Sequence, residues 1–453
     1  MDHLPLPRLT RRALLCAAAL PWARLALAAD DPVTITAQRT DAQLLANDSP
    51  KSAIWSFAEG MTPRIIRATQ GEELKLHFDN TLDFEMWLHW FGIRGPFDKM
   101  SFNVPAGGSG YDAVFTPPDA GTFWLGPLQD VSRLRDMGLY AMVIVAERDA
   151  PKELSDVPLV LDDWRLGDDG VISANFGDVE TMVGEGRLGN WFTVNGRFRP
   201  HIALEPGKYS RLRILNAANV RTMGLLFKGG DPLLIALDGQ PVKPAQLPEG
   251  AFKLAPGQRA DLLVSPSQSM TLALDLFEDV AEIAYLDAVK EGPHVDLAEN
   301  FALPANPISV KLDMAAARHA PLVIEGGIKG GLKSAEFKGQ TLDLRGLLEN
   351  GMGWAFNGMA GPGGPAVVAA KTGETIVLDV ENRTTFEQPI HIHGHVWRLV
   401  REDGEAPWRD TAVIPAQSSL SLAFLADNPG TWAIQSLIAE RADGGLLTGF
   451  TVG

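Results

Sequence analysis

A ten-residue pattern occurs three times along the chain, and it restricts the fold more than any other feature. Each copy begins with a glycine, continues with alternating polar and apolar residues and ends with an asparagine. The copies span residues 71–80, 207–216 and 373–382. Alternation at every second residue is typical of a half-buried β-strand, and the glycine favours a turn before it. The pattern therefore predicts three equivalent strands.

A second turn-and-strand unit follows each copy. These units begin at residues 104–107, 254–257 and 414–417. Two landmarks in matching places predict an all-β chain built from three copies of one β-sandwich unit. The expected domains are residues 30–148, 149–304 and 305–453. Residues 302–329, rich in Pro, Ala and Gly, are expected to be a linker, and residues 281–291 could form either a short helix or a loop.

The first 28 residues have the features of a removable export signal. The pair Arg11-Arg12 precedes an apolar run, and Ala26-Leu27-Ala28 offers a small-residue cleavage site. The apolar run is too short to span a bilayer as a helix. We expect twin-arginine export of the folded chain to the periplasm, with no membrane insertion after the signal is cleaved.

Cysteine content and charge exclude several kinds of site and partner. The one cysteine, Cys16, lies inside the expected signal, so the mature chain would have no thiol. It could form no disulfide and could not supply the thiolate that a type 1 (blue) copper centre needs. A formal net charge of −16 argues against nucleic acid or anionic lipid as a partner. A cation or a periplasmic protein partner remains compatible with it.

Three of the nine histidines lie close together between Gln388 and Trp397. His391, His393 and His395 occupy alternate positions, which share one face of a β-strand. Imidazoles gathered on one face can bind Cu, Zn, Fe or Ni. Such a pattern is also compatible with hydrogen-bonded core histidines that bind no metal.

Four short motifs together resemble the copper-ligand motifs of multicopper oxidases. They are His89-Trp90-Phe91, residues 124–128, residues 388–395 and residues 435–441. The resemblance covers essentially the whole mature chain. It implies an all-β fold of three cupredoxin-like Greek-key β-sandwich domains.

The resemblance also implies which copper ligands this chain keeps. His89 and His391 match type 2 ligands, and His393 matches one type 3 ligand. Other residues stand at the remaining type 3 positions, namely Phe91, Gly126, Leu128, Gln435 and Leu437. The type 1 positions carry Gln388, Ser436, Arg441 and Leu446. With these substitutions, four-electron reduction of oxygen is not expected, and the apolar residues would fill the former metal cavity by packing.

Two functions remain open at this point. The first is a non-catalytic periplasmic scaffold or binding protein, similar to copper-free, twin-arginine-exported family members that support cell division. The second is a mononuclear, type 2-like copper carrier or oxidoreductase that uses His89 and His391, with His393 as a candidate third ligand. In the first case the three histidines would be relics. No catalytic residue is predicted, and a laccase-type oxidase is disfavoured because the thiolate is missing. We interpret His395 as structural. The remaining histidines outside the motifs, expected at the surface, are His77, His201, His294 and His319.

Overall fold

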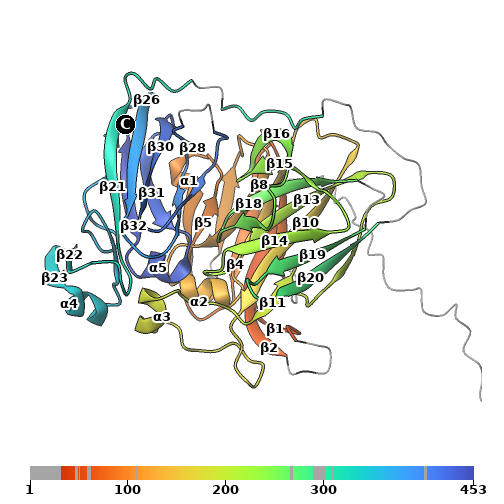
Figure 1. Ribbon diagram of the computed structural model, residues 1–453, viewed down its shortest axis with the longest axis horizontal. Helices are drawn as coiled ribbons and strands as arrows, with labels where there is room; N and C mark the ends of the chain where they lie inside the picture. Colours follow the sequence, from red (N-terminus) through yellow and green to blue (C-terminus); the bar gives the residue numbers. More distant parts are fainter. Residues whose placement is uncertain are drawn as a thin grey trace, which may run out of the picture. The chain divides into compact units, whose positions relative to one another are not determined.

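The computed structural model describes residues 32–453 except 46–48, 50, 59–62, 109, 266–268, 289–300, 309–310 and 402–405. The predicted export signal, residues 1–28, lies outside the described residues. Within them, strands form seven sheets and the five helices are short (Figure 1). The prediction of an all-β fold is confirmed.

The first third of the chain forms two sheets. One contains, in order, β2 (Ser52–Ser56), β1 (Val33–Ala42), β4 (Leu74–Asn80) and β7 (Tyr111–Phe115). The other contains β3 (Arg64–Thr69), β9 (Ala141–Ala146), β8 (Gly121–Pro127), β5 (Met86–Phe91) and β6 (Ser101–Val104). Two helices connect these strands, α1 (Phe97–Met100) and α2 (Val131–Asp136).

The middle third forms two further sheets around its own apolar core. One contains β11 (Trp191–Val194), β10 (Leu154–Trp164), β13 (Tyr209–Asn216), β18 (Arg259–Val264), β15 (Leu233–Leu237) and β16 (Gln240–Gln246). The other contains β12 (His201–Ala203), β20 (Val280–Asp287), β19 (Met270–Asp275), β14 (Met223–Lys228) and β17 (Phe252–Leu254). One helix belongs to this part, α3 (Val179–Val183).

The last third forms two large sheets and a hairpin. One sheet contains β24 (Trp354–Phe356), β21 (Arg318–Gly326), β26 (Glu374–Asn382), β30 (Ser418–Ala426) and β28 (Trp397–Leu399). The other contains β25 (Ala369–Ala370), β32 (Leu447–Val452), β31 (Gly430–Ser436), β27 (Gln388–Ile392) and β29 (Thr411–Ile414). The hairpin and helices are β22 (Ser334–Phe337), β23 (Gln340–Asp343), α4 (Leu344–Glu349) and α5 (Ala439–Asp443).

The three repeats occupy the same place in their sheets. They form β4, β13 and β26, and each pairs in parallel with the first long strand of its third of the chain, β1, β10 or β21. Every described sheet draws its strands from one third only. This division agrees with the expected domain order, and the domain boundaries themselves stay predictions.

The asparagine that ends each repeat connects the two sequence landmarks. Its side-chain Nδ2 donates to the backbone carbonyl at the start of the second landmark. The three bonds are Asn80 to Val104 at 3.3 Å, Asn216 to Leu254 at 2.8 Å and Asn382 to Ile414 at 3.1 Å. All three asparagines are buried, and each also accepts a bond from the backbone N–H two residues later. A buried amide must be satisfied, which explains why asparagine recurs at this position.

Two local expectations differ from the structure. Residues 281–287 are neither helix nor loop, because they belong to strand β20, which pairs along β19. The expected linker 302–329 contains strand β21, which buries Ala320, Leu322 and Ile324 at alternate positions. Pro321 is exposed between them and lies outside the stretch of β21 that pairs with β24.

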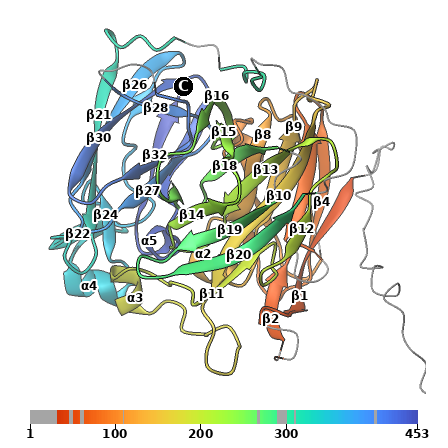
Figure 2. The same cartoon turned by 45° about the vertical axis from the view of Figure 1, so that its right-hand side comes forward.

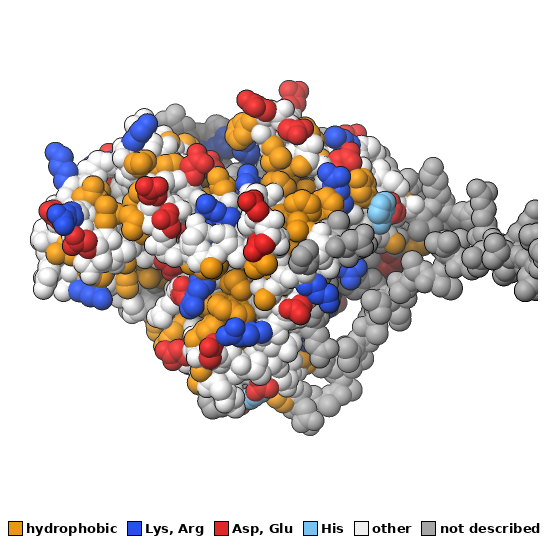
Figure 3. Space-filling model, turned by 90° about the horizontal axis from the view of Figure 1, so that it is seen from below, with side chains coloured by type: hydrophobic (Ala, Val, Ile, Leu, Met, Phe, Trp, Pro, Cys, Tyr) orange, Lys and Arg blue, Asp and Glu red, His pale blue; other side chains and the backbone are white. Residues whose placement is uncertain are grey.

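The first and last thirds of the chain are in contact through helices α2 and α5. These two helices lie side by side in both ribbon views (Figures 1 and 2). On the face seen from below, acidic and basic side chains are interspersed with patches of hydrophobic ones (Figure 3). Among the described helices, none combines the length and the apolar character needed to cross a membrane.

Candidate metal centre

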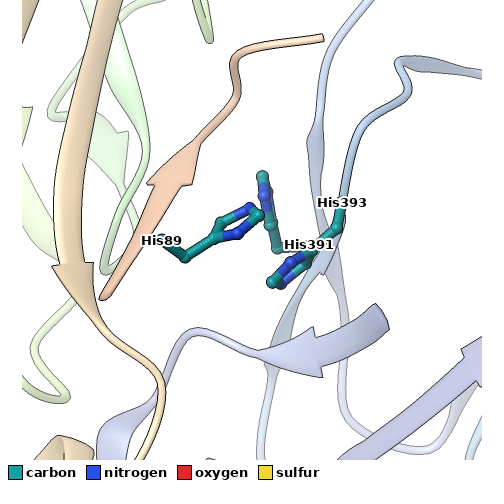
Figure 4. A group of neighbouring side chains, drawn as sticks. All are labelled: His89, His391 and His393. Atoms are coloured by element: carbon teal, nitrogen blue, oxygen red, sulfur yellow. The ribbon is translucent and has the colours of Figure 1, made fainter. Parts of the chain in front are cut away.

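The structure brings His89, His391 and His393 together. His89 lies on β5, His391 lies on β27 and His393 directly follows that strand. One nitrogen from each imidazole lies within 4.8 Å of the other two, and all three side chains are buried. Figure 4 shows the ring of His89 approaching from one strand and the other two rings from another.

Cross-strand neighbours fix the orientation of two of these rings. Ser101 lies opposite His89, and its Oγ is 2.8 Å from His89 Nδ1. Thr411 lies opposite His391, and its Oγ1 is 3.1 Å from His391 Nδ1. In the tautomer that donates from Nδ1–H to these oxygens, each ring keeps a lone pair on Nε2. Sequence reasoning missed both partners.

The Nε2 atoms of all three histidines are buried and have no hydrogen-bond partner among the described residues. Buried polar atoms are normally satisfied, so three orphans in one place require an explanation. Together they form a donor set of three nitrogens that point into a shared space. This arrangement fits a single bound metal ion, because the three Nε2 atoms are not hydrogen-bonded to one another.

The buried carboxylate of Asp410 lies beside Nδ1 of His391. Asp410 Oδ1 lies 3.3 Å from His391 Nδ1, and Thr411 Oγ1 donates to the same oxygen at 2.7 Å. Arg259 forms a bidentate pair with Asp410. Burial alone would raise the pKa of Asp410, but the charge of Arg259 lowers it below its usual range. Asp410 therefore stays ionised and helps to orient the His391 ring.

The electrostatics of the cluster favour neutral imidazoles. Burial, with a smaller contribution from neighbouring His391, lowers the pKa of His89 well below its ordinary value. Burial and the two other histidines lower the pKa of His393 in the same direction. A hydrogen bond that His393 donates to the side chain of Gln435 opposes this shift. Neutral imidazole is the form that binds a metal.

Three of the positions that the resemblance assigns to type 3 ligands carry apolar side chains that pack into one cluster, namely Phe91, Leu128 and Leu437. Phe91 lies against all three imidazoles, with ring centroids 5.0, 5.4 and 5.6 Å away. It stacks on Trp124 at 4.0 Å, and Leu437 completes the buried cluster, with half-buried Leu128 packed against it. A Cβ atom added to Gly126 would lie 2.2 Å from the Trp124 ring. The space for a side chain at position 126 is therefore occupied.

Two of the four positions that the resemblance assigns to type 1 ligands form a hydrogen-bonded pair. Arg441 Nη1 donates to Gln388 Oε1 at 3.0 Å, and Gln388 Nε2 donates to Thr384 Oγ1 at 3.1 Å. The guanidinium lies over the rings of Trp354 and Phe386, 4.8 and 4.9 Å from their centroids. Burial lowers the pKa of Arg441 to about 9. Cation–π contacts partly offset the loss of hydration.

The two remaining type 1 positions carry no group that binds copper strongly. Ser436 Oγ accepts a bond from the backbone N–H of Ile438 at 3.1 Å, and Leu446 is fully buried. A hydroxyl cannot replace the thiolate that a type 1 centre requires.

The other histidines lie outside the cluster. His395 is buried and its Nδ1 bonds to the carbonyl of His393 at 3.1 Å, which agrees with a structural role. His77, His201 and His319 are at least partly exposed, and each pairs with an aspartate at 2.6 to 2.9 Å. His294 lies outside the described residues.

Comparison with known proteins identifies the family. Three family models, each described as multicopper oxidase, match residues 11–150, 156–273 and 338–453. The chain belongs to the multicopper oxidase family. The crystal structure of a multi-copper oxidase from Pseudomonas thermotolerans superposes with a TM-score of 0.78 at 25% identity. It covers 93% of this chain and 99% of that one, so the three-domain cupredoxin fold is shared.

Relatives of this multicopper oxidase family member have two kinds of names. The multicopper oxidase MmcO of Mycobacterium tuberculosis (strain ATCC 25618 / H37Rv) is 25% identical over 408 residues, 82% of this chain and 77% of that protein. The cell division protein FtsP of Escherichia coli (strain K12) is 25% identical over 448 residues, 92% of this chain and 88% of that protein. Similarity at this level does not decide between the two names.

Proposed function

We propose that this chain is a multicopper-oxidase-like protein that does not reduce oxygen and acts as a periplasmic scaffold or binding protein. The observation that carries this proposal is the contact between Arg441 and Gln388. The guanidinium of Arg441 is hydrogen-bonded to the amide of Gln388, at the two positions where the family resemblance places type 1 histidines. With Ser436 in the thiolate position, electrons from a reducing substrate would have no entry point.

The second part of the oxidase machinery is also missing in this proposal. Phe91, Trp124 and Leu437 pack into one cluster beside the three imidazoles. Such packing leaves the single type 3 histidine, His393, without the partners that a dinuclear copper pair requires. Binding and four-electron reduction of oxygen would therefore fail even if electrons arrived.

A role in the cell envelope is supported by the FtsP relatives. They are named as cell division proteins, and the E. coli relative aligns over most of both chains. The expected twin-arginine signal would deliver this chain to the periplasm. The role predicts longer or lysis-prone cells when the gene is deleted and growth is stressed, with rescue by the wild-type gene. Normal cell length and envelope integrity in the deletion strain would contradict the envelope role.

A second candidate function is mononuclear metal binding, and the three unpaired Nε2 atoms favour it. His89, His391 and His393 would hold one copper ion, which would supply Lewis-acid or one-electron redox chemistry when bound. The chain contributes the orientation of the rings through Ser101 and Thr411. Its apolar wall would exclude water from one side of the site.

A double substitution tests this second function. His89→Ala with His391→Ala should abolish tight Cu²⁺ binding, because it removes two of three nitrogen donors. The same double variant should still rescue the deletion strain if the scaffold role needs no metal. Unchanged Cu²⁺ affinity would exclude the three-histidine site, whereas failed rescue with a folded protein would make the metal part of the envelope role.

A further inference from the structure

The turn between β19 and β20 presents an exposed aromatic residue. Phe277 is 96% exposed, whereas the next most exposed large hydrophobic residue in the described chain, Ile328, is 69% exposed. The turn is well defined by bonds of its own. Leu276 N–H donates to Asp279 O at 2.9 Å, and Phe277 N–H donates to Asp275 Oδ1 at 3.0 Å. Leu276 packs against the apolar core of this part of the chain, so the neighbouring phenyl ring points outward.

The backbone of Phe277 is strained. Its φ of 68° is in the left-handed region, which glycine and asparagine tolerate and a bulky residue rarely adopts. Phe277 is the one aromatic among the eight described non-glycine residues with positive φ. In the free chain the phenyl ring of Phe277 is therefore exposed to solvent, and the backbone of the residue is strained. Strained residues persist where a function requires them, so the role of this ring is in a contact outside the free chain.

The surroundings of the ring indicate the chemistry of that contact. Asp275, Glu278 and Asp279 are exposed around it, and none forms an ion pair with a lysine or arginine that the structure describes. Val280, 42% exposed, adds apolar surface at the same turn. A protruding aromatic ring within an acidic rim fits an apolar pocket bordered by basic side chains.

We propose that this turn, residues 275–280, is the anchor by which the protein docks a partner protein with an apolar pocket bordered by lysine or arginine. The inference rests on the proposed scaffold role and names the class of partner for it. An anionic membrane is disfavoured because three carboxylates surround the ring and the chain has a formal charge of −16. Aromatic anchors that fill pockets commonly dominate the affinity of an interface.

A second copy of the chain is the alternative to exclude. A pocket of about 630 Å³ in the last third of the chain is lined by Leu312, Met314 and Leu399 together with Lys311 and Arg401. Its chemistry resembles that of the expected partner site. A contact from turn to pocket between identical chains would be heterologous and would extend into open assemblies unless the rotation closes.

Site-specific photocrosslinking in the native host tests the proposal. The full chain, with its own signal, carries a photoreactive phenylalanine analogue at position 277 or, as a matched control, at position 328. We expect one protein adduct of discrete mass from position 277 and none of that mass from position 328. The adduct is identified, and that protein is purified for direct binding measurements with the mature chain.

Two variants then decide the role of the ring. Phe277→Asn should weaken binding of the purified partner at least tenfold and leave the thermal midpoint equal or higher, because asparagine tolerates the left-handed backbone. Ile328→Asn should change binding less than twofold. Binding should also weaken at high salt, because opposite charges meet at the rim.

Three results would overturn the proposal. They are no adduct at position 277, an adduct with a second copy accompanied by concentration-dependent sedimentation, or binding of the purified chain to anionic phosphatidylglycerol vesicles that Phe277→Asn abolishes. The same variant separates the turn from the scaffold role. If Phe277→Asn leaves partner binding intact and the wild-type gene rescues the deletion phenotype, the docking turn is wrong and the scaffold role stands. If the deletion strain has no phenotype, the scaffold role fails independently of the turn.

Discussion

Arg441 donates a hydrogen bond to Gln388 across the interior of the last third of the chain, at 3.0 Å, and both side chains are buried. The same guanidinium donates to the carbonyl of Glu387 at 2.7 Å. A charged donor and an amide are thus hydrogen-bonded to each other where copper ligands stand in the resembling family. The hydrogen bond between Arg441 and Gln388 is therefore a structural polar contact.

Replacing the buried guanidinium tests its structural role. Arg441→Ala should lower the free energy of unfolding by about 2–4 kcal/mol, because it leaves the Gln388 amide unsatisfied and opens a cavity between two aromatic rings. Urea denaturation followed by tryptophan fluorescence measures the change. Arg345→Ala is the control, since Arg345 is exposed and pairs only with Glu349, and it should change stability by less than about 0.5 kcal/mol. Equal effects of the two variants would contradict a structural role for Arg441.

The assignment of the type 1 position can be tested by rebuilding it. Ser436→Cys, combined with Gln388→His and Arg441→His, supplies a thiolate and two imidazoles at positions on β31, β27 and α5. We expect added Cu²⁺ to produce an intense blue thiolate absorption. The two histidine substitutions with Ser436 retained should stay colourless. A folded triple variant that binds copper without the blue band would show that these residues do not share one site.

The repeated asparagines make a separate prediction about stability. Asn216→Ala should lower the free energy of unfolding by roughly 1–3 kcal/mol, because the carbonyl of Leu254 and the N–H of Ala218 lose their buried partner. Thermal or urea unfolding checks this. Asn350→Ala is the matched control, because Asn350 is exposed and bonds only to Gly346 through its side chain. A loss of stability in Asn350→Ala as large as that in Asn216→Ala would contradict a special role for the repeated asparagines.

The repeated asparagines also show how much of the fold could be predicted from the sequence alone. The glycine-to-asparagine repeat predicted three equivalent strands, and the structure confirms them. The bonds from each asparagine to the second landmark could not be read from the pattern, because they join residues on different strands. The strand at residues 280–287 was missed because its apolar residues do not alternate strictly. The export signal, the domain boundaries and the metal itself remain predictions.

The candidate site was only partly predictable for a similar reason. The alternate spacing of His391 and His393 predicted a shared face, and the family resemblance added His89. Ser101, Thr411 and Asp410 were not predicted as their supports, because cross-strand register fixes those contacts. The position of the Trp124 ring beside Gly126 has no signal in the local sequence.

The junction between α2 and α5 predicts a pH dependence. Asp443 accepts bonds from the backbone N–H groups of Val131 and Ser132 at 2.9 and 2.8 Å, and burial raises its pKa to about 6. An unfolded aspartate titrates near ~4. The folded chain therefore holds this proton more tightly, so the contribution of Asp443 to stability is full below about pH 4 and is lost as the pH rises to about 6.

Substitution isolates that contribution. The stability of wild type minus that of Asp443→Asn should fall by on the order of 1–2 kcal/mol between pH 4 and pH 6.5. Asp130→Asn, at an exposed acid beside the same helix, should give no such slope. Parallel stability curves for wild type and Asp443→Asn would contradict the raised pKa.

The copper stoichiometry of the mature protein, measured with its visible and EPR spectra after purification without chelators, tests the central claim most directly. The three-histidine site predicts one copper per chain with a nitrogen-ligated signal, and both proposed functions predict no blue thiolate band and no oxygen uptake with reducing substrates. His89→Ala with His391→Ala should carry no copper. Three or four coppers per chain, or a blue band in the wild type, would contradict the account. Absence of copper from a folded wild type would contradict the three-histidine site and leave the scaffold role to be judged by the deletion strain.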